Sequence, residues 1–247
     1  MARKEIVIDP RMATVDTDRM ASQKFTQLPV VQVQTPDAEY AEKWNKYSAR
    51  AVKMVADIST WSEALIARDI AANIPNGTSL FISSSRPIRD LEGFAVAREG
   101  VETFANRGLA GIDGNISTAL GIASQRKETI AVLGDLGFLH DLTGLIQKEE
   151  INLKIFVINN DGRGIFSTLS QRGVEGFEEV FGTPHGLDPA AIAVSMGVAA
   201  KTIVTQKELI AELAQPVKGL SVVVVNAPDR EATADFLKGI YNSVASM

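Results

Sequence analysis

Two segments decide the fold of this 247-residue chain: Ala131-Val-Leu-Gly-Asp-Leu-Gly137 and Phe156-Val-Ile-Asn-Asn-Asp-Gly-Arg-Gly-Ile-Phe166. Each begins as a short apolar run typical of a buried strand, and each ends in glycine, carboxylate or amide residues. In a parallel sheet, ligands bind beyond the carboxyl ends of the strands. The two segments therefore predict a parallel sheet with a polar site where its strands end.

Apolar runs of the same kind alternate with helical patterns along the rest of the chain. A helix should begin at Thr60, with Glu63 at capping-box spacing, and stop near Gly77. Continuous strands separated by helices imply an α/β fold: a parallel sheet of about six strands with helices on both faces. The expected strands are 79–83, 101–105, 129–133, 154–158, 199–203 and 220–225, and the other expected helices are 38–58, 87–95, 114–125, 138–148, 189–196, 206–214 and 230–243.

The first 36 residues do not follow this alternation. Two β-type runs, Ile6-Val7-Ile8 and Val30-Val31-Gln32-Val33, are separated by polar residues and proline. We interpret residues 1–48 as the remnant of a central domain with its linker, and residues 49–247 as the domain that carries the site. A disordered N-terminal arm is the alternative.

Composition limits the class of protein. The chain is 45% hydrophobic and 22% charged, as ordinary globular proteins are. A net charge of −5 disfavours a nucleic-acid partner. The absence of cysteine excludes disulfides and thiolate metal sites and favours the cytoplasm. No apolar run approaches the length of a membrane span, so no membrane insertion is expected.

The strongest chemical signal is a set of oxygen donors at two strand ends. Asp135 offers a carboxylate, Asn160 an amide oxygen, and the Gly162 region a backbone carbonyl. Three such donors suit Mg²⁺ or Mn²⁺ completed by a phosphate ligand. Gly137 and Gly164 allow the backbone to approach a diphosphate closely. The alternative is that these are only turn residues, but their recurrence at two strand ends argues against it.

A second signal is cationic. Ser85-Arg-Pro-Ile-Arg89 follows one strand and Asn106-Arg-Gly108 another, which suggests recognition of carboxylate or phosphate groups. Arg86 fits a solvated loop arginine equally well. His140 and His185 fit ordinary surface histidines, and no catalytic triad or zinc motif can be assembled from the spacing. Dinucleotide-loop and P-loop spacings are absent.

The pairing of Gly134-Asp135 with Asn159-Asn160 resembles the cofactor motif of thiamine-diphosphate enzymes. From about Arg50 to the C-terminus, the chain is similar to the MenD family, the 2-succinyl-5-enolpyruvyl-6-hydroxy-3-cyclohexene-1-carboxylate synthases. The segments that carry this similarity are Ser85-Arg-Pro-Ile-Arg-Asp90, Asn106-Arg-Gly-Leu-Ala-Gly-Ile-Asp-Gly114, Gly134-Asp-Leu-Gly-Phe-Leu-His-Asp141, Asn159-Asn-Asp-Gly-Arg-Gly-Ile-Phe166 and Phe181-Gly-Thr-Pro-His-Gly-Leu-Asp188.

The resemblance implies a function and a role for individual residues. That family decarboxylates 2-oxoglutarate and adds the succinyl carbanion equivalent to isochorismate in menaquinone biosynthesis, a transferase reaction that forms a C–C bond. By resemblance, Asp135, Asn160 and the Gly162 carbonyl bind Mg²⁺ (or Mn²⁺), and Ile112 holds thiamine diphosphate bent. Substrate contacts fall on Ser85, Arg89, Arg107, Ile165, Phe166 and Leu169, and cofactor contacts on Arg107, Gly108, Gly111, Ile112, Asp135, Leu136, Gly137, Asn160, Gly162, Gly164 and Ile165.

The chain departs from the family pattern in three respects. Arg163 stands where glycine is frequent, and Gly137 where serine is frequent. The family's catalytic glutamate belongs to an N-terminal domain that residues 1–36 cannot supply. We therefore expect this chain to be inactive alone and to work within a homo-oligomer of the full-length protein. The alternatives are another thiamine-diphosphate enzyme, of the acetolactate synthase or 2-oxoacid decarboxylase type, and a non-catalytic binding or assembly domain.

Overall fold

The structure is a computed structural model that describes residues 5–11, 20–30, 37–147 and 150–246. The chain divides into two compact units, Met1–Ser48 and Ala49–Met247. In the smaller unit, strand β1 (Glu5–Ile8) pairs in parallel with β2 (Ala21–Phe25). The predicted run at residues 6–8 thus lies in β1. Val30 lies outside any strand, and residues 31–33 lie outside the described part of the chain.

The larger unit is built on a parallel six-stranded sheet, which confirms the predicted α/β class. Its strands lie in the order β4-β3-β5-β6-β8-β7. Because the chain passes from β3 outward to β4 and then returns to β5 on the other side, the loops after β3 and β5 diverge and open a crevice. The bounds are β3 (Ser79–Ile82), β4 (Glu102–Phe104), β5 (Thr129–Gly134), β6 (Leu153–Asn159), β7 (Ala199–Ile203) and β8 (Leu220–Asn226).

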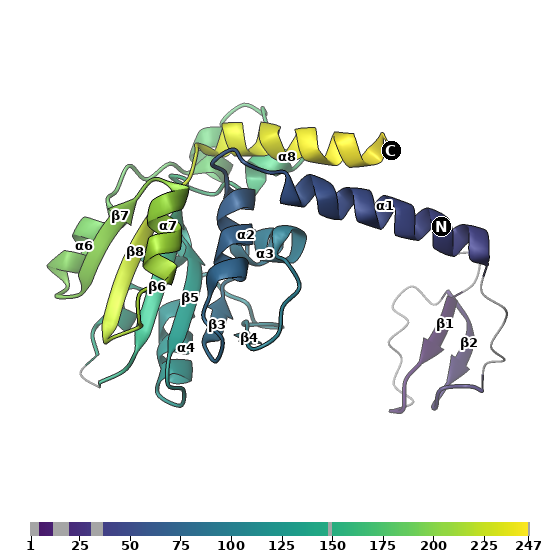
Figure 1. The fold of residues 1–247 in the computed structure, drawn as a ribbon, viewed down its shortest axis with the longest axis horizontal. Coiled ribbons are helices and arrows are strands. Elements are labelled where there is room, and N and C mark those ends of the chain that lie inside the picture. Colours follow the sequence, from purple (N-terminus) through teal and green to yellow (C-terminus); the bar gives the residue numbers. More distant parts are fainter. Residues whose placement is uncertain (1–4, 12–19, 31–36, 148–149, 247) are drawn as a thin grey trace. The chain divides into compact units, whose positions relative to one another are not determined.

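Helices cover both faces of this sheet (Figure 1). Helices α2, α3 and α7 pack on one face, and α4, α5 and α6 on the other. Helix α8 packs in a third, smaller cluster against the segment before α2, the first turn of α2 and the end of α3. The helix bounds are α1 (Ala38–Ala56), α2 (Glu63–Asn73), α3 (Arg86–Phe94), α4 (Asn115–Ala123), α5 (Asp135–His140), α6 (Pro189–Ser195), α7 (Gln206–Leu213) and α8 (Arg230–Ala245).

Alternation along the strands explains why the sheet needs helices on both sides. In β5, Ile130 and Val132 face α2 and α3, whereas Ala131 and Leu133 face α4 and α5. Phe156 in β6 is fully buried. Side chains of a strand point to opposite faces in turn, so a strand that is apolar throughout is stable only between two layers.

One predicted helix, at 138–148, is wrong. Helix α5 begins earlier, at Asp135, and ends at His140, and a short 3-10 turn follows at Leu142–Leu145. The break has a tertiary cause: the Asp141 carboxylate accepts the backbone N–H of Ser117 at 2.8 Å and so caps the start of α4.

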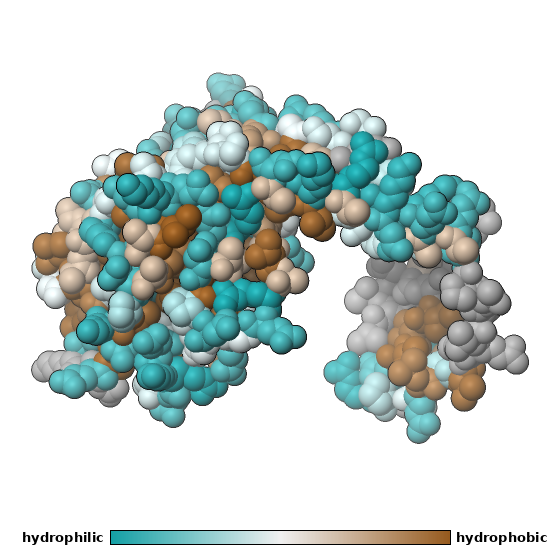
Figure 2. Space-filling view, in the orientation of Figure 1, coloured by the Kyte–Doolittle hydropathy of each residue, from teal (hydrophilic) through white to brown (hydrophobic). Residues whose placement is uncertain are grey.

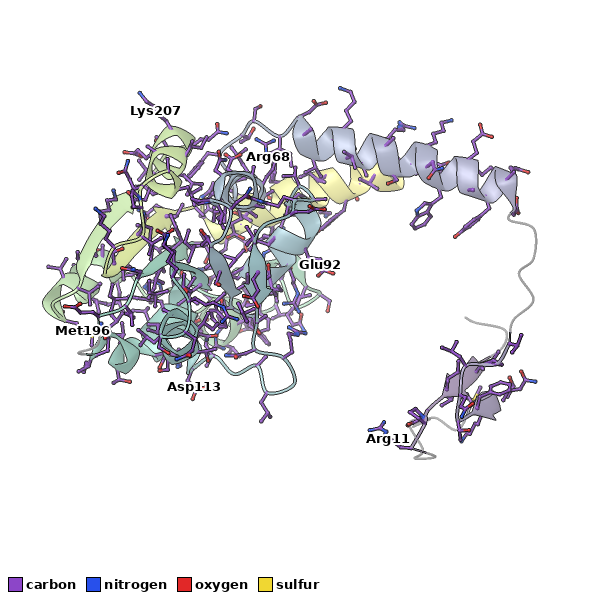
Figure 3. The ribbon with its side chains drawn as sticks, turned by 60° about the horizontal axis from the view of Figure 1, so that its bottom comes forward. Arg11, Arg68, Glu92, Asp113, Met196 and Lys207 are labelled. Atoms are coloured by element: carbon purple, nitrogen blue, oxygen red, sulfur yellow. The ribbon has the colours of Figure 1, made fainter. Side chains whose placement is uncertain are left out.

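The predicted start of α2 is also wrong. The N-cap is Ser62, whose hydroxyl accepts the N–H of Leu65 at 3.2 Å, and not Thr60. From within α2, the guanidinium of Arg68 (Figure 3) donates to three carbonyls at and just after the end of α1, those of Val55, Ala56 and Ile58. An arginine at this point satisfies carbonyls that the helix cannot bond itself.

The surface is of mixed polarity. Figure 2 shows hydrophilic side chains over most of the visible face of the larger unit, with hydrophobic ones in small groups, as is usual for water-exposed surfaces. Across the described residues, no helix combines the length and the apolarity needed to cross a bilayer.

Candidate active site

A cavity of about 650 Å³ lies at the carboxyl edge of the sheet, at the crevice beside β3 and β5. The loops that follow β3, β4, β5 and β6 all contribute to its wall, as expected for ligand sites of open parallel sheets. Among the residues predicted for the site, those that line it are Ser85, Arg89, Arg107, Gly111, Ile112, Asp135, Leu136, Gly137, Asn160, Gly162, Gly164, Ile165 and Phe166.

Asp135 stands at the end of β5 and is only 3% exposed. Its Oδ1 accepts the N–H of Leu136 at 2.7 Å. Its Oδ2 accepts the N–H of Gly162 at 2.9 Å and that of Asn160 at 3.3 Å. The carboxylate therefore joins the loop after β5 to the loop after β6, which fixes both at the floor of the cavity.

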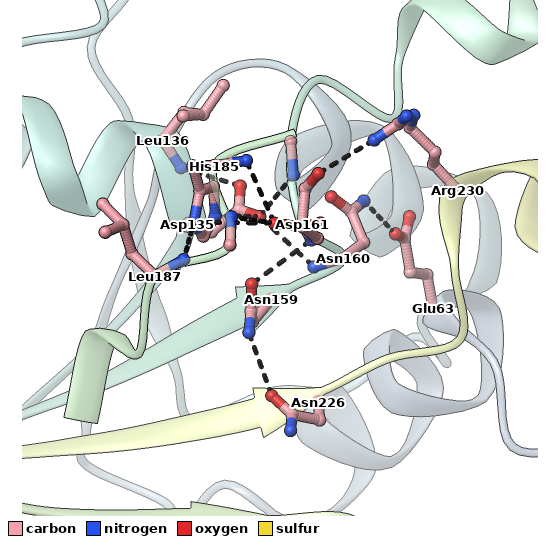
Figure 4. Close-up of polar contacts among 12 residues, drawn as sticks. Glu63, Asp135, Leu136, Asn159, Asn160, Asp161, His185, Leu187, Asn226 and Arg230 are labelled. Atoms are coloured by element: carbon pink, nitrogen blue, oxygen red, sulfur yellow. Dashed lines mark hydrogen bonds and ion pairs between the residues drawn. The ribbon is translucent and has the colours of Figure 1, made fainter. Parts of the chain in front are cut away.

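Asn160 follows β6 and is held through its amide nitrogen (Figure 4). Its Nδ2 donates to Glu63 Oε1 at 2.5 Å. Its Oδ1 is buried and has no hydrogen-bond partner among the residues that the structure describes. Buried side-chain oxygens are usually hydrogen-bonded, so an unpartnered one in a cavity wall is a candidate ligand position.

The loop that contains Gly162 packs backbone against backbone. Gly162 has φ +137°, and a Cβ added there would lie 2.4 Å from the carbonyl oxygen of Gly182. The same carbonyl accepts the N–H of Arg163 at 2.9 Å. Next to it, Asp161 adopts φ +59°, which is uncommon for a residue other than glycine. Such strained backbone clusters at functional sites, where the surrounding structure holds it in place.

A second loop, residues 183–187, closes on the same region. Asp161 Oδ1 accepts the N–H groups of His185 and Gly186 at 3.1 and 2.7 Å. His185 Nε2 lies 3.3 Å from Asp135 Oδ2, and its Nδ1 accepts the N–H of Leu187. The hydrogen bond to Asp135 raises the pKa of His185, against an opposing effect of burial. His185 therefore faces the site, whereas His140 ends α5 on the exposed surface.

Behind Asn160 lies a buried charged cluster. Arg86 Nε donates to Glu63 Oε2 at 3.2 Å, and Arg86 Nη2 is paired with Asp90. Burial, and after it the nearby Glu63 carboxylate, raises the pKa of Asp90 to about 8. The interpretation of Arg86 as a solvated loop arginine is therefore wrong, because its side chain is 11% exposed.

The other two arginines stand at the rim. Arg89 and Arg107 line the cavity and are exposed. Arg89 Nη1 donates to the carbonyl of Ser85, a residue with φ +73°. Of the remaining predicted site residues, Leu169 is 46% exposed and lies outside the cavity wall, as does Gly108.

The donor set fits a magnesium-type ion. Asp135 provides a carboxylate, Asn160 an unpartnered amide oxygen, and the close-packed backbone at Gly162 leaves no room for a side chain. Mg²⁺ prefers few protein oxygens and completes its shell with water and phosphate. Within the described residues there is no group of three histidine, cysteine or acidic side chains that could hold a metal instead.

Sequence reasoning missed some contributors to this site. Glu63 was interpreted as part of a helix cap, but it is buried and contacts Asn160, a residue 97 positions away. The i,i+4 spacing of Arg86 and Asp90 was the only available signal for their pairing. No sequence signal indicated Arg230, which donates to the Asp161 carbonyl at 2.9 Å.

The chain is similar to known proteins over most of its length. Residues 94–227 match the family model of the thiamine pyrophosphate enzyme, C-terminal TPP binding domain. The 2-succinyl-5-enolpyruvyl-6-hydroxy-3-cyclohexene-1-carboxylate synthase of Thermobifida fusca is 37% identical over 99% of this chain and 46% of its own length. The synthase of Kineococcus radiotolerans is 40% identical over 82% of the chain and 39% of its own length.

The fold has a solved counterpart too. A crystal structure from Mycobacterium smegmatis, assigned to the thiamin diphosphate-dependent enzymes, aligns with a TM-score of 0.56 at 20% identity, over 68% of this chain and 32% of its own. At that identity the likeness speaks for the fold alone. The chain spans about half the length of the synthase from Thermobifida fusca and a smaller share of the synthase from Kineococcus radiotolerans.

Proposed function

Because this chain belongs to the thiamine pyrophosphate enzymes, as their C-terminal TPP binding domain, we propose that its cavity binds the diphosphate of thiamine diphosphate through Mg²⁺ or Mn²⁺. The observation that carries this proposal is the buried Asn160 Oδ1, which has no partner in the described part of the chain although Asn160 lies in the cavity wall. Asp135 and the Gly162 backbone would be the other ligands.

The enzyme we propose is a synthase of the kind its relatives are named for. It would decarboxylate 2-oxoglutarate and join the remaining succinyl unit to isochorismate. Thiamine diphosphate supplies the electron sink for such a decarboxylation. The synthases at 37% and 40% identity support this assignment. We further propose that this transferase acts in the cytoplasm as an oligomer, together with sequence corresponding to the half of its relatives that the chain does not cover.

The protein's own residues would select acidic substrates. Arg89 and Arg107 bring two guanidinium groups to the rim of the cavity, and such groups match carboxylates in a planar, two-point contact. The inner wall near Ile165 is apolar: Phe166 packs at 5.4 Å between ring centroids against Phe181. This combination would orient a dicarboxylate with its charged ends at the rim and its carbon chain inside.

Titration calorimetry of thiamine diphosphate, with and without Mg²⁺, tests the cofactor site on this chain. We expect binding that depends on the metal and is lost in Asn160→Ala. Asn160→Ala leaves intact the hydrogen bonds from backbone N–H groups to the Asp135 carboxylate, so the variant should keep the fold of the wild type. Circular dichroism would check this. Binding that ignores both the metal and the substitution would refute the site.

The reaction is tested on a protein that carries this chain together with sequence equivalent to the rest of its relatives. Product from 2-oxoglutarate and isochorismate, weakened by Arg107→Ala, supports the synthase. Turnover with pyruvate alone would instead favour an enzyme of the acetolactate synthase or 2-oxoacid decarboxylase type.

A further inference from the structure

A buried series of polar contacts lies behind Asn160 and fixes the orientation of its side-chain amide. Glu63, the first residue of α2, is 2% exposed and accepts from Asn160 Nδ2 with Oε1 and from Arg86 Nε with Oε2. Arg86 is held in turn by Asp90. Figure 4 shows Glu63 directly beside the Asn160 amide.

This arrangement decides which way the Asn160 amide faces. A carboxylate only accepts hydrogen bonds, whereas an amide has one donating and one accepting end. If the Asn160 amide were reversed, its oxygen would meet the Glu63 carboxylate, acceptor against acceptor. Glu63 therefore holds the NH₂ group on its own side and leaves Asn160 Oδ1 as the free, buried acceptor.

Glu63 is not the residue that caps the N-terminus of α2. Ser62 caps α2 through its hydroxyl and the N–H of Leu65 at 3.2 Å. A glutamate in the first turn of a helix is normally at the surface, where it interacts with the helix dipole. Burial of this side chain between an amide and a guanidinium needs another reason.

We propose that Glu63 is a positioning residue for the metal, keeping Asn160 Oδ1 turned toward the ion, and that Arg86 sets the orientation of Glu63. The inference rests on the proposed function of the site. Partners of this kind, which orient a ligand without touching the metal, typically change metal affinity about 10–100-fold when they are replaced.

The substitution Glu63→Gln gives a directional test. Arg86 only donates, so it would take the oxygen of the introduced amide and turn the NH₂ group toward Asn160. Asn160 would then reverse and present its own NH₂ group to the cation. In the double variant Glu63→Gln/Arg86→Met, this constraint is gone and either orientation is open. We expect the metal affinity to fall in the order wild type, double variant, Glu63→Gln.

The measurement is equilibrium dialysis of Mn²⁺ against the 247-residue chain at a fixed concentration of thiamine diphosphate. Glu63→Gln should bind Mn²⁺ about 10–100-fold more weakly than wild type. Ser62→Ala is the matched control, because it weakens the start of the same helix by about 0.5–2 kcal/mol without touching Asn160. Its Mn²⁺ affinity should stay within about twofold of wild type.

The outcomes separate this inference from the proposed function. If wild type retains no Mn²⁺, or Asn160→Ala binds it as well as wild type, the metal site itself is refuted. If Asn160→Ala loses Mn²⁺ but Glu63→Gln stays within twofold of wild type, only the positioning role is overturned. The same holds if Ser62→Ala loses as much affinity as Glu63→Gln. If Glu63→Gln fails to fold, the double variant decides between these results: Mn²⁺ affinity within twofold of wild type overturns the positioning role, and a lower affinity supports it.

Discussion

Gly162→Ala is the sharpest test of the packing that builds the site. The backbone at Gly162 has φ +137°, a region that side chains rarely adopt. The added Cβ would also lie 2.4 Å from the Gly182 carbonyl oxygen and 3.0 Å from that of Thr183. Both contacts are with backbone atoms, so no side-chain rotation relieves them.

The expected cost follows from these two effects. Backbone strain of this kind costs about 1–3 kcal/mol, and overpacking a further amount of about 1–3 kcal/mol. Alanine restricts the unfolded chain, which returns about 0.4–1 kcal/mol. We therefore expect Gly162→Ala to lower the free energy of unfolding by about 1–5 kcal/mol, with the middle of that range at about 3 kcal/mol.

Urea unfolding gives this quantity by linear extrapolation. Fluorescence of Trp61 is a suitable probe in the larger unit, because its indole N–H donates to the carbonyl of Asn226 at 2.9 Å. Circular dichroism of the same samples checks that the transition is two-state.

Two other glycines serve as controls. Gly173 has φ +84° and open space around it, so Gly173→Ala should show the backbone cost alone, about 1–2 kcal/mol. At Gly137 the nearest atom to an added Cβ is 3.7 Å away and φ is ordinary, so Gly137→Ala should be neutral or slightly stabilising. A loss in Gly162→Ala no larger than that in Gly173→Ala would refute the close backbone packing.

Three further outcomes are expected from the same structure. Burial and the Glu63 carboxylate raise the pKa of Asp90 from 3.8 to about 8, although Arg86 lowers it. Between these two pH values the folded state therefore holds a proton on Asp90 that the unfolded state has released. Its contribution to stability is complete below the unfolded pKa of 3.8 and is lost as pH rises to about 8. Asp90→Asn should therefore flatten the decline in urea stability between these two pH values, and an unchanged slope there would contradict the assignment. Phe156→Ala, at a fully buried site in β6, should cost about 3–5 kcal/mol in the same assay. Arg126→Ala, which breaks an exposed ion pair, should cost less than about 1 kcal/mol, and a larger loss would show that the pair is better shielded than its exposure indicates.

The sequence was sufficient to predict the parallel sheet and the polar residues at the carboxyl ends of its strands. Strands such as β5 and β6 are continuous apolar runs, and their ends are marked by Gly134-Asp135 and Asn159-Asn160. Parallel strands that are buried on both faces consist almost entirely of apolar residues, so the number of strands and their ends can be recognised from the local sequence pattern. Most of the predicted site residues, though not Gly108 and Leu169, line one cavity because the carboxyl ends of parallel strands share an edge of the sheet.

What escaped prediction depends on contacts between distant segments. The pattern of residues 138–148 favours a helix, but α5 ends at His140, and the Asp141 side chain accepts a backbone N–H at the start of α4. Glu63 has the spacing of a surface cap, but its partner lies across the fold. The pairing of β1 with β2 is likewise a matter of register between separate runs. Local periodicity carries no information on such partners.

The separation of 97 positions between Glu63 and Asn160 has a consequence for folding. Glu63 and Asn160, a proposed metal ligand, come from segments separated by strands β3, β5 and β6, so their contact requires long-range structure of the larger unit. A ligand that binds only the native state stabilises it by linkage, by about 2.7 kcal/mol when present at a hundredfold excess over its dissociation constant. If the cofactor binds only this native arrangement, its binding would raise the free energy of unfolding of the whole larger unit.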